Sequence, residues 1–174
     1  MTIPKYARTE HESRFSVTTL ADLALGDYSH IEDRYIGGTR LRLRCVTFRN
    51  GAAPVLKLCK KYGAVADAAE PVVNICLGPD EYTLFSILSA LTVVKRHHHI
   101  LDQRNRFASD VFEAALTGLV IAELETDDTA ASHAVTMPSW AAREITDDPW
   151  FRGGNLATVS GEMLAARLEA RSKS

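Results

Sequence analysis

The chain has 174 residues, of which 46% are hydrophobic and 24% charged, so it can bury the core of one ordinary domain and has no bias towards disorder. Its formal net charge of −2 at pH 7 argues against nucleic-acid binding, because proteins that bind nucleic acid electrostatically usually have a strong excess of basic residues. The N-terminus has no apolar signal-peptide region, and no apolar stretch approaches the length that spans a membrane. We therefore expect a soluble cytoplasmic protein that binds neither nucleic acid nor membranes.

Runs of alternating residues bounded by turn-forming residues predict a chain made mostly of strands. In chain order the predicted elements are a strand over 8–17, a short helix over 18–25, strands over 29–36, 39–49, 55–62 and 72–77, a helix over 79–90, strands over 92–101, 104–112 and 119–126, a turn of helix over 138–143 and a helix over 159–170.

Two turns containing glycine indicate how neighbouring strands are joined. Gly37-Gly38 separates two predicted strands and fits a tight turn. Asn50-Gly51 predicts a hairpin with a type I′ turn, because both central residues of that turn have positive φ, which Asn and Gly tolerate. The strand over 55–62 should therefore return antiparallel to the strand over 39–49.

Acidic residues alternate along two of the predicted strands, as Glu10 with Glu12 and as Glu123 with Glu125. Because successive side chains of a strand point to opposite faces, each pair points both carboxylates the same way. Carboxylates at this spacing can hold a hard divalent cation. Asp110 belongs to the same group of acids.

Basic residues are patterned in the same way. A run of alternating arginines puts three guanidinium groups on one face of a strand, and such rows bind phosphate oxygens. The acids and bases together suggest a metal-dependent site for a polyanion. The bases of this group are Arg40, Arg42, Arg44, Lys57, Lys61 and Lys95.

Two architectures can be built from these strands. In an ordinary sandwich the charged faces would point to water and serve solubility alone. The grouping of acids and bases fits better with a closed antiparallel barrel that has a polar interior, because about eight strands can enclose one small ligand. The predicted class is α+β, mainly β: an eight-stranded antiparallel β-barrel that forms a tunnel, with helices packed outside.

The order of several motifs resembles the CYTH superfamily, also called the triphosphate tunnel metalloenzymes. The resemblance covers about residues 6–157, followed by a C-terminal helix over about 159–171, and so implies one domain over 1–174. It also implies an eight-stranded tunnel barrel that hydrolyses or cyclises triphosphate compounds with Mg²⁺ or Mn²⁺. The segments that carry it are 10–15, 33–44, 57–61, 80–82, 110–112, 118–125 and 140–149.

The resemblance assigns roles to single residues. Arg14 stands where the family usually has Lys, and it keeps the positive charge while losing the ammonium whose pKa is easily shifted. The implied catalytic residues are Glu123, Glu125 and Arg14, and the implied metal ligands are Glu10, Glu12, Asp110, Glu123 and Glu125.

The implied phosphate-binding residues are the six bases named above together with His97. Lys95 aligns with the lysine of a family K-x-R pattern, which puts His97 in the place of the arginine. Only His97 and His99 of the His97-His98-His99 run share a strand face, which is a weak zinc signal. Cys45, Cys59 and Cys76 are odd in number and lack zinc spacing, so we interpret them as reduced thiols outside the site.

Hydrolysis of a triphosphate, inorganic tripolyphosphate in particular, is the preferred hypothesis. Adenylate cyclase and thiamine triphosphatase activities remain alternatives, although each needs a pocket for an organic group. A non-catalytic polyphosphate- or nucleotide-binding module is also open, because Arg14 and His97 depart from the family pattern. The four paired glutamates weigh against it, since a binder without a metal gains nothing from carboxylates that face phosphate. A homodimer is left open too.

Overall fold

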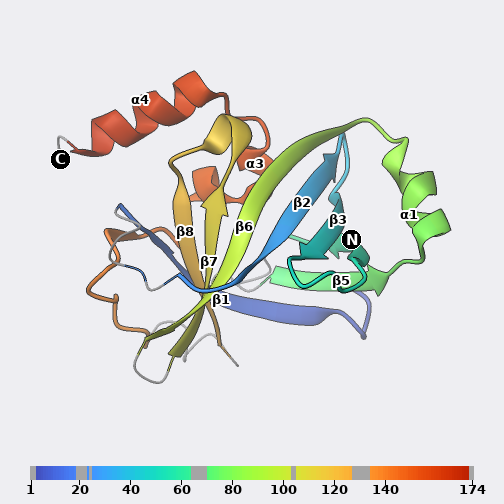
Figure 1. Cartoon of the computed structure of the whole chain (residues 1–174), viewed down its shortest axis with the longest axis horizontal. Coiled ribbons are helices and arrows are strands. Elements are labelled where there is room, and N and C mark those ends of the chain that lie inside the picture. The colour runs from blue at the N-terminus through green and yellow to red at the C-terminus, as the bar shows by residue number, and fades with distance from the viewer. Residues whose placement is uncertain are drawn as a thin grey trace.

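Strands close into an antiparallel barrel in this computed structural model, and short helices lie around the barrel (Figure 1). The structure describes residues 3–18, 23, 25–63, 70–102, 105–126 and 134–172. Its strands are β1 (Arg8–Ser16), β2 (Tyr28–Ile36), β3 (Leu41–Phe48), β4 (Val55–Lys61), β5 (Glu70–Cys76), β6 (Ala90–Asp102), β7 (Asn105–Phe112), β8 (Val120–Thr126) and β9 (Arg143–Glu144). Its helical elements are α1 (Pro79–Ser86), η2 (Ala114–Leu116), η3 (Pro149–Phe151), α3 (Gly153–Leu156) and α4 (Gly161–Ser172).

The barrel follows the strand order β5-β4-β3-β2-β6-β7-β8-β1, and β1 closes it by also pairing with β5. All of these pairings are antiparallel. The predicted class, α+β and mainly β with an eight-stranded antiparallel barrel, is confirmed. The predicted strands occur in the predicted order, and their ends differ by only a few residues.

Strand β1 joins the two edges of the barrel. Its first part pairs with β5, where Glu10 lies opposite Glu70. Its second part pairs with β8, where Arg14 lies opposite Glu123. The short strand β9, which the sequence pattern did not predict, pairs with the end of β1 at Phe15 and Ser16. Closure at β1 therefore brings together acids that are more than one hundred residues apart in the chain.

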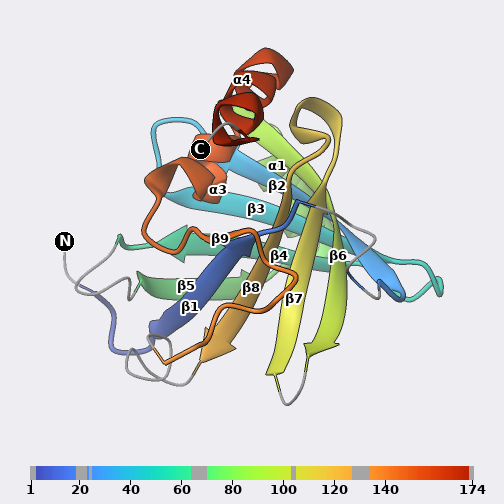
Figure 2. The ribbon, with the colours of Figure 1, turned by 90° about the vertical axis from the view of Figure 1, so that its left-hand side faces the viewer.

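Hydrophobic side chains fill part of one end of the barrel. Val93, Phe112 and Ile121 lie two residues from charged interior residues on β6, β7 and β8, and so share their strand faces. They belong to one buried cluster with Phe151 and Leu156 of the C-terminal segment. Figure 2 shows α3 and α4 at that end of the barrel. We call the segment formed by η3 and α3 the C-terminal plug.

Different segments cover the outer face of the barrel. Helix α1 packs Tyr82 and Phe85 against a cluster that includes Leu43 and Leu58. On another side, Trp140 packs against Phe107 at 5.1 Å between ring centroids. The Trp140 indole N–H donates a hydrogen bond to Asp102, at 3.0 Å. Packing against the outside of the barrel leaves its interior free for polar side chains.

The hairpin between β3 and β4 is antiparallel as predicted, but the type I′ turn is wrong. Gly51 N–H donates to the carbonyl oxygen of Phe48 at 3.3 Å, so the turn spans 48–51. Only Gly51 has positive φ in this turn, at 76°. Asn50 instead accepts a hydrogen bond from Ala52 N–H through its side chain, at 3.1 Å. This local bond offers Asn a conformation that competes with the left-handed one.

The predicted helix over 79–90 is too long, because α1 ends at Ser86. The Ser89 carbonyl accepts a hydrogen bond from Gly37 N–H, and Ala90 already pairs with Ile36 in the sheet. Pairing with β2 therefore removes the last residues from the helix.

Two further helix predictions have different outcomes. The turn of helix over 138–143 is wrong: Ala141 N–H donates to the Pro138 carbonyl in a single turn, and β9 follows. The short helix over 18–25 lies mostly outside the described residues. None of the described helices is long and apolar enough to cross a lipid bilayer.

Candidate functional site

A cavity of about 500 Å³ lies inside the barrel, a volume within the range of small-molecule sites. The alternation of strand side chains turns most of the predicted charged rows towards it. The predicted site residues that line this cavity are Glu10, Glu12, Arg14, Arg40, Arg42, Arg44, Lys61, Lys95, His97, Asp110 and Glu123.

Two predicted site residues do not border this cavity. Lys57 lies on β4, opposite Arg44 in the sheet, and is partly buried. Glu125 lies on β8 with its carboxylate 2.5 Å from the guanidinium of Arg8, and both side chains are at least half exposed. The predicted roles of Lys57 in phosphate binding and of Glu125 in metal binding and catalysis remain predictions.

Asp33 binds two arginines of the predicted phosphate-binding row. Arg44 donates to both carboxylate oxygens of Asp33, at 2.6 and 2.7 Å, and Arg42 Nε lies 3.5 Å from the same group. Asp33 is almost fully buried. Burial alone would raise the pKa of its carboxyl group, but the two guanidinium groups outweigh this effect and hold the pKa below its ordinary value. The arginine row is therefore ordered before any ligand arrives.

A second buried carboxylate, Asp110, contacts Lys95 and His97 of β6. Lys95 Nζ forms an ion pair with it, and His97 Nδ1 lies 2.7 Å from its other oxygen. Burial opposes ionisation of Asp110, yet Lys95 and His97 lower its pKa well below the usual range. Asp110 was predicted as a metal ligand, and in this arrangement its oxygens are engaged by the two side chains of β6.

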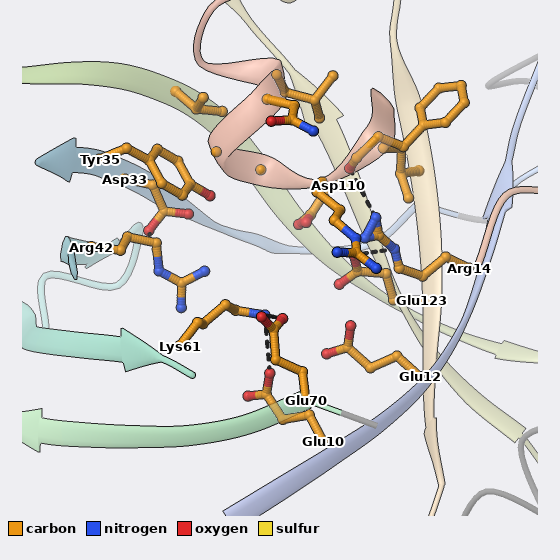
Figure 3. A pocket seen from close by; sticks show the side chains of 18 of the residues that line it. Glu10, Glu12, Arg14, Asp33, Tyr35, Arg42, Lys61, Glu70, Asp110 and Glu123 are labelled. Carbon is orange, nitrogen blue, oxygen red and sulfur yellow. Dashed lines mark hydrogen bonds and ion pairs between the residues drawn. The ribbon is translucent and has the colours of Figure 1, made fainter. Parts of the chain in front are cut away.

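Lys61 binds two acids at the seam between β1 and β5. Its ammonium lies 3.3 Å from Glu10 and 2.9 Å from Glu70. Figure 3 marks both ion pairs with dashed lines. Burial alone would lower the pKa of Lys61, but the two carboxylates outweigh it and raise the pKa. Two predicted site residues, Glu10 and Lys61, are therefore brought together, and Glu70 joins them.

Glu12 differs from the other acids because no ion pair holds its carboxylate among the described residues. In Figure 3 it points into the pocket near Glu123. Burial, and next the negative charge of Glu123, raise the pKa of Glu12 to about 7, against the weaker opposite effects of Lys61 and Arg14. This part of the cavity therefore has negative charge that is not fully compensated.

Arg14 links Glu123 of β8 to the C-terminal plug. Its guanidinium donates to the Phe151 carbonyl at 2.8 Å, and its Nε lies 3.6 Å from Glu123. Its backbone N–H donates to the Thr146 hydroxyl at 3.0 Å. The Arg14 side chain is thus fixed at the junction of β1, β8 and the C-terminal segment.

Several lining residues were not assigned by the sequence analysis. Asp33 could have been found from the register of the β2–β3 hairpin, which puts it opposite Arg44. Tyr35 shares its strand face, and most of the others come from segments without a charge pattern, so their place in the cavity depends on how the chain packs. The main additions are Asp33, Tyr35, Glu70, Thr146, Arg152 and Asn155.

The carboxylates in the cavity fit a divalent cation whose other ligands are phosphate oxygens. Among the described residues, no three His, Cys, Asp or Glu side chains converge closely enough to enclose an ion. However, Mg²⁺ is usually held by one or two carboxylates together with substrate phosphates and water. Glu12 and Glu123 can supply two such carboxylates, and a cation bound between them would oppose the effects of burial and of Glu123 that raise the pKa of Glu12.

We expect Glu12→Gln to stabilise the metal-free protein at pH 8. Because the folded-state pKa of about 7 exceeds the ordinary value of 4.5, the contribution of Glu12 to the free energy of unfolding is fully present below pH 4.5 and is lost as the pH rises through 7. The loss should be about 3 kcal/mol, at about 1.4 kcal/mol per pKa unit. Urea denaturation in chelator at pH 4.5 and pH 8 measures it, with the exposed Glu162→Gln as control. Equal pH dependence in parent and Glu12→Gln would contradict this electrostatic account.

The closed barrel with charged side chains in its interior has the fold of the CYTH-type tunnel proteins, as the sequence resemblance implies. No model of a known protein family matches the chain, and no curated protein matches it either.

Solved structures match this fold. A structure described as the hypothetical protein NE1496 has a TM-score of 0.59 and 22% sequence identity, and the match covers 87% of this chain and 99% of that chain. Another, described as the inorganic triphosphatase NE1496, has a TM-score of 0.57 and 22% identity over 85% and 93% of the two chains. PH1819 from Pyrococcus horikoshii OT3 has a TM-score of 0.53 and 14% identity over 71% and 82%. At these identities the similarity concerns the fold.

Proposed function

We propose that this protein is a divalent-metal-dependent hydrolase that acts on a triphosphate moiety, with inorganic tripolyphosphate as its preferred substrate. The observation that carries the proposal is the charge arrangement inside the barrel. Glu12 and Glu123 lie in the same cavity as Arg42, Arg44 and Lys95, which are ordered by buried carboxylates. The shared fold with a structure described as an inorganic triphosphatase supports the same activity.

The basic residues would hold the substrate in an extended conformation. Arg42 and Arg44 present planar guanidinium groups, which bind phosphate oxygens through paired hydrogen bonds. Lys95 adds a point charge from β6. Fixing the substrate in this way positions the reacting phosphorus for in-line attack by water.

The acidic residues would hold the metal. Glu12 of β1 and Glu123 of β8 are the proposed ligands, and Glu10 lies on the same face of β1 as Glu12. A bound divalent cation would neutralise charge on the phosphoryl oxygens and activate water. Arg14 would stabilise charge on the phosphate from its fixed position beside Glu123.

We expect Mg²⁺ or Mn²⁺ to be required for activity and to raise the melting temperature. The cation would bind the folded protein more tightly than the unfolded chain, which stabilises the fold by linkage. Phosphate release from tripolyphosphate and thermal melting, each measured with added metal and after exhaustive chelation, test this dependence. Glu12→Gln should lose most of the metal-induced shift in melting temperature. Full activity after chelation would refute the metal-dependent mechanism.

A further inference from the structure

Arg14 is bound to the C-terminal segment both through its backbone and through its side chain. Its backbone N–H donates to the Thr146 hydroxyl at 3.0 Å, and its carbonyl accepts from Ile145 N–H at 2.7 Å. Its guanidinium donates to the Phe151 carbonyl at 2.8 Å. The backbone contacts fix the start of the side chain. The position of the Phe151 carbonyl therefore decides where the charged end lies relative to Glu123 and the cavity.

The Phe151 carbonyl belongs to an element that needs outside support. Phe151 is the last residue of η3, which is a single turn of three residues. So short a helical turn has little stability of its own. The Phe151 side chain is buried in the cluster at the end of the barrel, but this anchor alone does not fix the orientation of the backbone carbonyl.

Asp148 supports this turn at its start. Its carboxylate accepts a hydrogen bond from Trp150 N–H at 3.1 Å, and its backbone carbonyl accepts one from Phe151 N–H at 3.2 Å. These bonds hold the peptide groups that lead into Phe151. The other carboxylate oxygen of Asp148 lies 3.2 Å from Arg143 of β9 and 2.9 Å from Arg167 of α4. Asp148 therefore connects the turn to two elements that flank it.

The capping hydrogen bond to Trp150 N–H should contribute more to this support than the ion pairs do. The side chains of Arg143 and Arg167 are 49% and 41% exposed, and ion pairs at such positions stabilise little. The side chain of Asn155 also binds the turn, through the Pro149 carbonyl at 2.7 Å. Loss of the Asp148 cap should therefore loosen η3 without unfolding the protein.

We propose that Asp148 is a positioning residue of the proposed reaction. Its cap on η3 orients the Phe151 carbonyl, and this carbonyl holds the Arg14 guanidinium beside Glu123, where it would meet the phosphate. Asp148 does not line the cavity, so it affects the reaction through Arg14. The inference rests on the proposed function, in which Arg14 stabilises charge on the substrate.

The NMR resonance of the Arg14 Nε–H group tests the positioning without any substrate. This resonance is identified by its absence from the spectrum of Arg14→Lys. In Asp148→Ala it should shift and broaden, because the guanidinium loses its fixed acceptor. Asp148→Asn keeps a side-chain oxygen that can cap η3, so it should restore the parent resonance. Asp147→Ala is the matched control, because Asp147 is the exposed neighbour in the chain and should leave the resonance unchanged.

Steady-state kinetics on tripolyphosphate with Mg²⁺ test the consequence for turnover. Asp148→Ala should lower kcat about tenfold and change KM by less than about twofold, because Arg42 and Arg44 still bind the substrate. Asp148→Asn should keep most of the parent kcat. In the Arg14→Ala background, Asp148→Ala should lower kcat by less than about twofold more, because the side chain through which it acts is gone.

Thermal melting separates this role from a purely structural one. Losing the cap should lower the melting temperature by about 2–4 °C with or without the Arg14 side chain, so the kinetics are measured well below the transition. A purely structural role would lower kcat by the same factor in both backgrounds.

Such an equal loss of kcat would refute the inference and leave the proposed function standing. An unchanged Arg14 resonance in Asp148→Ala would refute it too, as would a loss of kcat in Asp148→Asn as large as in Asp148→Ala. If the parent releases no phosphate from tripolyphosphate, the proposed function fails, and with it the role in catalysis. The resonance then still decides whether Asp148 positions Arg14.

Discussion

Glu123→Gln should abolish most turnover of tripolyphosphate while leaving the fold intact. The variant keeps the shape of the side chain but removes one of the two carboxylates proposed to hold the metal. Losing such a group should lower kcat by at least about a hundredfold, as for other groups that stabilise charge in the transition state. The Glu123 side chain is 30% exposed and its contact with Arg14 is 3.6 Å long, so little stability depends on its charge.

Steady-state kinetics with Mg²⁺ and circular dichroism on the same samples measure the two effects separately. Glu162→Gln, an exposed change at the start of α4, should behave like the parent in both assays. Glu125→Gln adds a comparison on the same strand. Because Glu125 does not line the cavity, we expect it to lose less turnover than Glu123→Gln. Normal turnover of Glu123→Gln would remove Glu123 from the proposed mechanism.

Asp33→Ala should destabilise the protein by about 3–5 kcal/mol, the range for removing one partner of a buried ion pair. The change leaves Arg42 and Arg44 without the carboxylate that they share, and Asp33 itself is only 1% exposed. Urea denaturation measures the loss. Asp27→Ala is a matched control, because Asp27 is fully exposed and its distance to Arg49 is 4.0 Å.

The same variant also reports on phosphate binding. An anion that occupies the cavity can replace the missing carboxylate beside the two arginines. Tripolyphosphate should therefore raise the melting temperature of Asp33→Ala more than that of the parent. Equal stabilisation of both proteins would mean that Arg42 and Arg44 do not contact the anion.

The strands and their inward faces could be predicted because a strand has a simple repeat of two residues. Glu12, Arg42 and Glu123 all lie on the predicted faces and border the cavity. The Gly37-Gly38 turn was predicted too, and Gly38 has positive φ at 67°. Counting outward from this turn gives the pairing of Asp33 with Arg44. The sequence therefore contained the signal for this ion pair, although the charge pattern alone did not reveal it.

Contacts between distant segments could not be predicted in this way. The pairing of Glu10 with Glu70 depends on how β1 closes the barrel, and no local pattern encodes that closure. The C-terminal plug has no regular hydrophobic repeat, because η3 and α3 are short and irregular. Phe151 and Leu156 are positioned by packing against the barrel interior. The plug, with Arg152, is therefore known only from the tertiary structure.

The most direct test of the proposed function is the initial rate of phosphate release from tripolyphosphate, ATP, thiamine triphosphate and long-chain polyphosphate, with Mg²⁺ and with Mn²⁺. Cyclic AMP is assayed in the ATP samples. We expect tripolyphosphate to be hydrolysed fastest, only with metal, and without formation of cyclic AMP. Cyclic AMP formation from ATP, or the absence of phosphate release from every compound despite measurable binding, would contradict the proposed triphosphatase.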